Sequence, residues 1–216
     1  MANYWYWYWN RHLQAVVLPE LKKLYEFQEQ HVVPILELRG NQGSAQAEPS
    51  VHQVPVTFYS DSPAVIERLR KDTVIEQFEL MQALAVYTNA TCEALYLEAS
   101  RFLLLLHRKE ILSVGEEHSD SLPVLGDLSN VFAEQGVNLK QLEGFEAYDL
   151  LRVIAHYHGH VRGDSGEELR QRRPNWVNLS PTGWGMALIQ PAEVKPLYEN
   201  LCKFLVQVIE ALHQSW

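Results

Sequence analysis

Cysteine, long apolar runs and an excess of positive charge are all scarce in this 216-residue chain. The two cysteines, Cys92 and Cys202, lie far apart and form no C-x-x-C pair. This spacing indicates neither a disulfide framework nor a zinc cluster, so we expect two buried free thiols in preference to a single bridge. The apolar run at residues 102–106 is far shorter than the roughly 20 residues that cross a bilayer.

A secretory leader is also missing from the pattern. The aromatic run at residues 4–9 is short and is bordered by Asn3, Asn10 and Arg11, which does not match the long apolar core of a signal peptide. We therefore expect a cytoplasmic protein that does not enter a membrane.

Positive charge is low overall, because the formal net charge is −9. This excludes a protein that coats DNA or RNA through general basicity. The charge is unevenly distributed, however. Residues 110–150 carry nine acids against one base, a local charge of −8, whereas residues 151–216 carry seven bases against six acids, a local charge of +1. A focused site for a polyanion therefore remains possible in the C-terminal third, and the acidic segment could receive a basic partner.

The apolar periodicity predicts a mostly α protein, a helical bundle with a long central helix. That helix is expected over residues 72–108, where apolar and small residues recur at alternating steps of four and three. Such a stripe is typical of the spine of a bundle or of a dimer contact. Further helices are expected at 19–38, at 122–135, from Leu139 or Gly144 to about His158, and at 191–213. A minor β-hairpin is expected before the last helix, around the turn at residues 181–185.

We expect residues 1–60 to form an N-terminal extension and residues 61–216 to form a helical domain. The extension would contain the aromatic run, a helix and a flexible linker at residues 40–55, which is rich in Gly, Ser, Gln, Ala and Pro. The alternating Tyr and Trp of the run suit a strand. The run could stack nucleic-acid bases, form an oligomer contact or cover a core.

Ionisable side chains are densest at residues 151–164, which read LRVIAHYHGHVRGD. Three histidines, His156, His158 and His160, follow Arg152 within eight residues. Histidine exchanges protons near neutral pH, and arginine offers a planar charged fork for phosphate oxygens. These groups are the minimum equipment for cleaving RNA without a metal. Four further arginines follow and could bind phosphate: Arg162, Arg170, Arg172 and Arg173.

Two other interpretations of the histidines stay open. They could be structural, because imidazolium is favourable at the negative end of a helix and Gly159 could cap that end. They could also bind a metal, but alternate residues on a helix point about 200° apart. No carboxylate completes a usual ligand set here, so we predict no metal and no cofactor.

At this cluster the sequence resembles the HEPN superfamily, over roughly residues 70–215. Members carry an arginine followed, after four to six residues, by a histidine, and Arg152 and His158 have five residues between them. The downstream Gly159 aligns His156 instead, and the family's common polar residue after the arginine is Val153 here. The preceding segment GDLSNVFAEQGVNLKQLEGFEAYDLLR resembles the helix–loop–helix of toxin-like members. The polar loop, β-like stretch and final helix that follow are also similar.

The resemblance implies a metal-independent endoribonuclease in stress response or phage defence. Arg152 would stabilise the phosphate, and His158 or His156 would act as acid or base. It also implies a homodimer with RNA as substrate and a protein partner such as an antitoxin. The alternative is a HEPN-like protein with a degraded motif, which binds RNA or forms a dimeric interaction module without catalysis.

Overall fold

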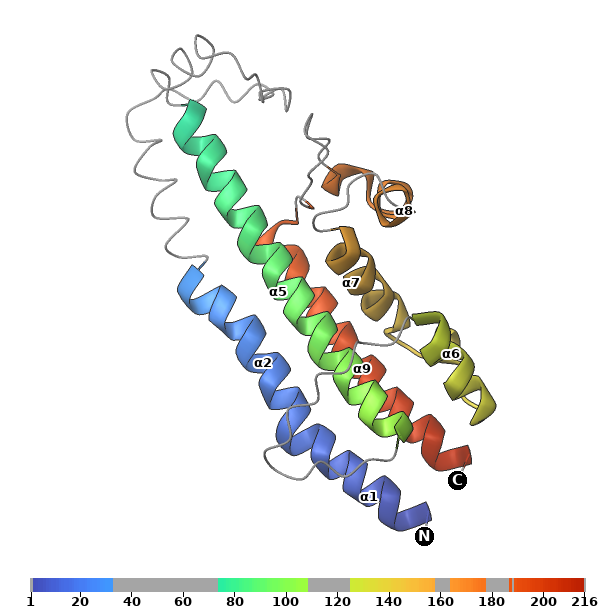
Figure 1. Cartoon of the computed structure of the whole chain (residues 1–216). Coiled ribbons are helices and arrows are strands. Elements are labelled where there is room, and N and C mark those ends of the chain that lie inside the picture. The colour runs from blue at the N-terminus through green and yellow to red at the C-terminus, as the bar shows by residue number, and fades with distance from the viewer. Residues whose placement is uncertain are drawn as a thin grey trace. The chain divides into compact units, whose positions relative to one another are not determined.

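The described residues of this protein are almost entirely helical. The computed structural model describes residues 2–32, 74–108, 125–157, 164–177, 187 and 189–215. The mostly α bundle with a long helix, α5 (Val74–Arg108), is confirmed (Figure 1). The predicted linker at residues 40–55 and the boundary at residue 60 lie outside the described residues.

These described residues fall into two compact units. Unit 1 takes its residues from 1–25, 93–151 and 195–216, and unit 2 takes its residues from 26–92 and 152–194. Residues 1–25 of the predicted extension belong to unit 1, and the domain division stays a prediction. Each unit is described separately below.

Unit 1 begins with a helix where the alternating aromatics predicted a strand. Helix α1 (Ala2–His12) continues through the π-helical segment η1 (Leu13–Val17) into α2 (Leu18–Phe27). Its buried residues are Trp9, Leu13, Val17 and Leu21. These residues are spaced four apart, and each such step rotates a side chain about 40° around the axis of an α-helix. The wider π-helical turn offsets part of that rotation, so the four side chains stay on one face. The prediction of a strand at residues 4–9 was wrong.

Aromatic contacts hold α1 and α2 to the rest of unit 1. Trp9 packs edge-on against Phe102 of α5, with ring centroids 6.2 Å apart. Tyr25 of α2 stacks on Tyr198 of the C-terminal helix α9 (Pro191–Ser215) at 4.8 Å. Trp9 is 1% exposed, so part of the aromatic run covers the core, as one of the three interpretations of that run predicted.

The core of unit 1 lies among α5, α7 (Phe145–Tyr157) and α9. Tyr148 of α7 stacks on Phe204 of α9 at 5.2 Å and shares a buried 3.1 Å hydrogen bond with Ser100 of α5. The short helix α6 (Leu125–Glu134) is followed by a turn at Gly136, which has φ 82° and leads towards the 3₁₀ segment η3 (Leu139–Gln141). The end of the helix predicted at residues 122–135 is thus confirmed to within one residue.

The apolar stripe of α5 is used inside the chain. Seven of its predicted positions are buried: Ala85, Thr88, Cys92, Leu95, Ala99, Phe102 and Leu106. The stripe is therefore the spine of a bundle, and it does not supply a dimer contact along the part of α5 whose side chains are described. Both cysteines are free, as predicted, but only Cys92 is buried, since Cys202 is half-buried. Burial raises the pKa of the Cys92 thiol to about 12. Among the described helices, none is long and apolar enough to cross a membrane.

Unit 2 contains the segment where the hairpin was predicted. Its described residues show one antiparallel bridge, between Val177 and Ala187, and no strand. The turn at residues 181–185 lies outside the described residues, so the hairpin stays a prediction. Unit 2 also contains π-helical η2 (Gln28–Val32), α8 (Asp164–Arg172) and 3₁₀ helix η4 (Pro174–Trp176).

A buried amide joins α5 to the bridge in unit 2. Asn89 accepts a hydrogen bond from the Ala187 amide at 3.1 Å and donates to the Ala187 carbonyl at 2.7 Å. Both residues are at most 1% exposed. The Asn89 side chain therefore satisfies both backbone polar groups of Ala187, as a neighbouring strand would.

We expect Asn89→Ala to lower the free energy of unfolding by about 2–3 kcal/mol, because it leaves a buried amide and carbonyl unpaired. Urea denaturation followed by circular dichroism measures this change. Thr91→Ala is the matched control, since the Thr91 hydroxyl bonds the Tyr87 carbonyl of the same helix at an exposed position. Equal losses in the two variants would contradict the role given to Asn89.

Candidate functional site

The ionisable cluster lies where the C-terminal end of α7 meets α8 in unit 2. Leu151, Ile154 and Tyr157 of α7 are buried, whereas Arg152 is partly buried and His156 is exposed. Arg152 and His156 are four residues apart on one helix, so their side chains leave the same face on successive turns. The predicted arginine and one of the predicted histidines are thus neighbours on α7.

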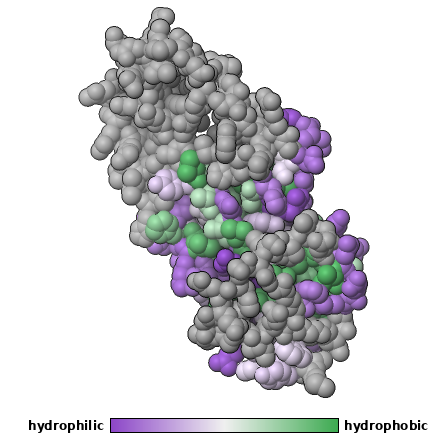
Figure 2. All heavy atoms as spheres, viewed as in Figure 1, coloured by the Kyte–Doolittle hydropathy of each residue, from purple (hydrophilic) through white to green (hydrophobic). Residues whose placement is uncertain are grey.

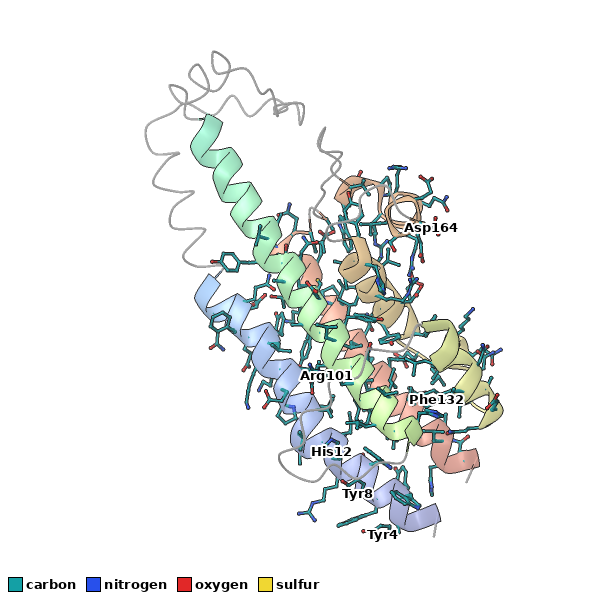
Figure 3. All side chains as sticks on the ribbon, viewed as in Figure 1. Tyr4, Tyr8, His12, Arg101, Phe132 and Asp164 are labelled. Atoms are coloured by element: carbon teal, nitrogen blue, oxygen red, sulfur yellow. The ribbon has the colours of Figure 1, made fainter. Side chains whose placement is uncertain are left out.

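Helix α8 has the charge distribution that stabilises a helix. Asp164 and Glu167 lie in its first turn, and Arg170 and Arg172 lie in its last turn, which complements the helix dipole. Leu169 is its fully buried side chain. Figure 3 labels Asp164 at the start of α8, and Figure 2 shows hydrophilic residues over the described surface there.

An ion pair links α7 to α8. The Arg152 guanidinium donates from Nη2 to both carboxylate oxygens of Glu168, at 3.1 and 3.2 Å. The Arg172 guanidinium donates to Oε1 of the same carboxylate at 2.8 Å. The Arg152 and Arg172 side chains are 19% and 20% exposed, and that of Glu168 is 36% exposed. One carboxylate is therefore held between two guanidiniums, with a formal charge of +1 for the three groups.

The two remaining described arginines of the predicted site, Arg170 and Arg173, are more exposed than Arg152 and Arg172. Arg170 forms an ion pair with Glu167, one turn away on α8. The Arg173 guanidinium lies over the Trp176 ring, 5.5 Å from its centroid. Trp176 in turn donates to Glu193 at 3.0 Å. These contacts orient Arg170 and Arg173 without burying them.

The last residue of α7, Tyr157, carries a buried phenol. Tyr157 is 0% exposed, and its burial raises the pKa of the phenol, an effect that the charge of Arg170 partly offsets. A tyrosine with a raised pKa stays neutral at physiological pH. Tyr157 is therefore a buried, neutral side chain at the end of α7.

The structure brings five of the predicted site residues into one unit: Arg152, His156, Arg170, Arg172 and Arg173. His158 and Arg162 lie outside the described residues, as does His160. Sequence reasoning missed Glu168. Its position four residues before Arg172 on a polar helix indicates an ion pair with that arginine, but nothing local connects it to Arg152.

A metal site is not found in the described part of the chain, where no three His, Cys, Asp or Glu side chains gather closely enough to hold an ion. Two of the three histidines of the metal interpretation are outside that part. The described groups offer nitrogen donors and positive charge, which suit an anion better than a cation.

A second exposed feature belongs to unit 1. Tyr4 and Trp7 are 58% and 54% exposed, and the Arg11 guanidinium lies 5.3 Å from the centroid of the Trp7 ring. Tyr4, Tyr8 and His12 follow one another along α1 (Figure 3). Part of the aromatic run is therefore accessible, while Trp9 is in the core.

Comparison with protein-family models, with curated proteins and with solved structures finds no match for this chain. The assignment of a function therefore depends on the residues of the α7–α8 cluster and on their chemistry.

Proposed function

We propose that this protein binds the phosphodiester backbone of RNA at the α7–α8 cluster and cleaves it without a metal ion. The observation that carries the proposal is the exposed His156 on the same helical face as Arg152. Three further arginines belong to the same unit: Arg170 and Arg172 of α8, and Arg173 directly after it. An imidazole beside several guanidiniums suits a phosphate undergoing displacement, because it combines proton exchange with positive charge.

In this reaction the ribose 2′-oxygen attacks the adjacent phosphorus and the bond from phosphorus to the 5′-oxygen breaks. One group removes the 2′-hydroxyl proton and another returns a proton to the leaving oxygen. His156 or His158 would serve one of these roles. The guanidiniums would stabilise the negative charge that grows on the phosphate oxygens. The products would be a 2′,3′-cyclic phosphate and a 5′-hydroxyl.

The resemblance to the HEPN superfamily supports the same proposal, since it names Arg152 and a following histidine as the reactive pair. A homodimer and a protein partner such as an antitoxin belong to this proposal. The described part of the α5 stripe lends no support to the dimer, because it is buried within one chain.

RNA binding without cleavage is the second candidate function. The contact that favours it is the ion pair of Arg152 with Glu168, since a guanidinium already held by a carboxylate stabilises a transition state less well. In this case the cluster would retain RNA affinity and lack turnover.

The test is incubation of the purified protein with single-stranded RNA in EDTA, followed by gel analysis of the products. We expect cleavage by the wild type and a loss of about 100-fold or more in Arg152→Ala, because the arginine stabilises charge on the phosphate. Lys195→Ala is the control, because Lys195 is an exposed cation in an exposed pair with Glu199. Binding without cleavage would favour the second candidate, and neither binding nor cleavage would reject both.

A further inference from the structure

The carboxylate of Glu168 lies where two arginines could bind a phosphate. Two guanidiniums from two helices, Arg152 of α7 and Arg172 of α8, converge on one anion. Convergent guanidiniums are the usual ligands of phosphate, because their N–H groups match its oxygens. We propose that Arg152 and Arg172 form a phosphate clamp, and that Glu168 occupies the clamp in place of a phosphate when no RNA is bound.

The exposure of the three groups is consistent with such an exchange. Glu168 is more exposed than either arginine, at 36% against 19% and 20%. The carboxylate is therefore the most accessible member, and it can turn towards water while the two guanidiniums stay in place. An entering phosphate then replaces one anion by another, so neither partly buried arginine is left unpaired, which would be costly.

The consequence is that Glu168 weakens RNA binding by competing for the clamp. This inference rests on the proposed function, because it describes how that site takes its ligand. The wild type must displace a charge-assisted ion pair before a phosphate enters. A variant without that carboxylate charge binds without this cost. Glu168 therefore lowers the affinity of the site for phosphate.

The experiment compares Glu168→Gln with the wild type, using fluorescence anisotropy and a 2′-O-methyl oligoribonucleotide that cannot be cleaved. Inorganic pyrophosphate, as a competitor of a labelled anion, is the second probe. We expect Glu168→Gln to bind both probes about tenfold more tightly, since it removes a charge in direct contact with both arginines. Glu167→Gln is the matched control, because it removes the same charge one residue away, from an exposed pair with Arg170.

Two results would overturn the clamp. The first is equal tightening by Glu168→Gln and Glu167→Gln, which would indicate a general change of charge. The second is tightening that persists when Arg172→Ala is added to Glu168→Gln, because the clamp requires both arginines. Should Glu168→Gln unfold, Arg172→Ala alone decides the matter. It must weaken pyrophosphate binding more than Arg170→Ala does, and equal effects would reject the clamp.

The proposed function and the clamp fail in different ways. Cleavage of RNA by the wild type with no gain from Glu168→Gln would leave the proposed function standing and reject the clamp. Tighter pyrophosphate binding by Glu168→Gln with no binding of RNA would support the clamp and reject RNA as its ligand.

Discussion

Gly144→Ala is expected to destabilise unit 1 by about 3 kcal/mol or more, the sum of backbone strain and overpacking. Gly144 has φ +84°, a conformation that side chains with a Cβ rarely adopt. A Cβ at this position would also lie 2.1 Å from the Asn200 carbonyl oxygen and 3.0 Å from the Phe204 amide nitrogen of α9. Backbone atoms cannot rotate away, so α7 would have to move from α9.

The measurement is the free energy of unfolding in urea, with the melting temperature as a second reading. Gly136→Ala is the matched control, because Gly136 also has a positive φ, 82°, but is exposed at the end of α6. It should cost about 1 kcal/mol, from the strain alone. A loss at Gly144 no larger than that at Gly136 would show that α7 and α9 do not approach as closely as described.

Removal of the exposed histidine should reduce activity as strongly as removal of Arg152. We expect His156→Gln to slow RNA cleavage by about 100-fold or more, which is typical of the loss of a general acid or base. His156 lies one turn beyond Arg152 on the same face of α7, so in the proposed reaction it would act on a phosphate bound by that arginine. Because His156 is exposed, its substitution should not unfold the protein, so a lower rate would reflect the chemistry.

Single-turnover rates in EDTA, measured together with binding of the uncleavable oligonucleotide, separate chemistry from affinity. His213→Gln is the control, since His213 stacks on Tyr6 in unit 1 and is outside the cluster. Full activity of His156→Gln together with a loss in His158→Gln would move the catalytic role to His158. Full activity of both variants would remove histidine from the reaction.

The regular elements could be predicted well where an apolar repeat runs over many turns. Alternating steps of four and three predicted the long helix at 72–108, and the structure has α5 at Val74–Arg108. The last helix was predicted at 191–213 and is observed at Pro191–Ser215. A long repeat leaves little freedom, because only a helix places all of its apolar residues on one face.

The first helix could not be predicted in this way. Every residue from 4 to 9 is aromatic, so local hydrophobicity does not distinguish an inward face from an outward one. The distinction appears only in the packing, where Trp9 contacts Phe102 and Tyr6 stacks on His213. The buried residues of α1, η1 and α2 are also spaced four apart throughout. This spacing departs from the α-helical period of about 3.6 residues, so the apolar face is not visible as a helical pattern in the sequence.

The candidate site was likewise predictable only in part. By itself the sequence determined that the chain is mostly α, that Arg152 and His156 share a helix end, and that arginines follow. Only the tertiary structure decided that Arg152 faces Glu168, sixteen residues away, and that Arg172 shares this carboxylate. Helical periodicity acts over three or four residues, whereas the pairing of Arg152 with Glu168 depends on how α8 packs against the end of α7.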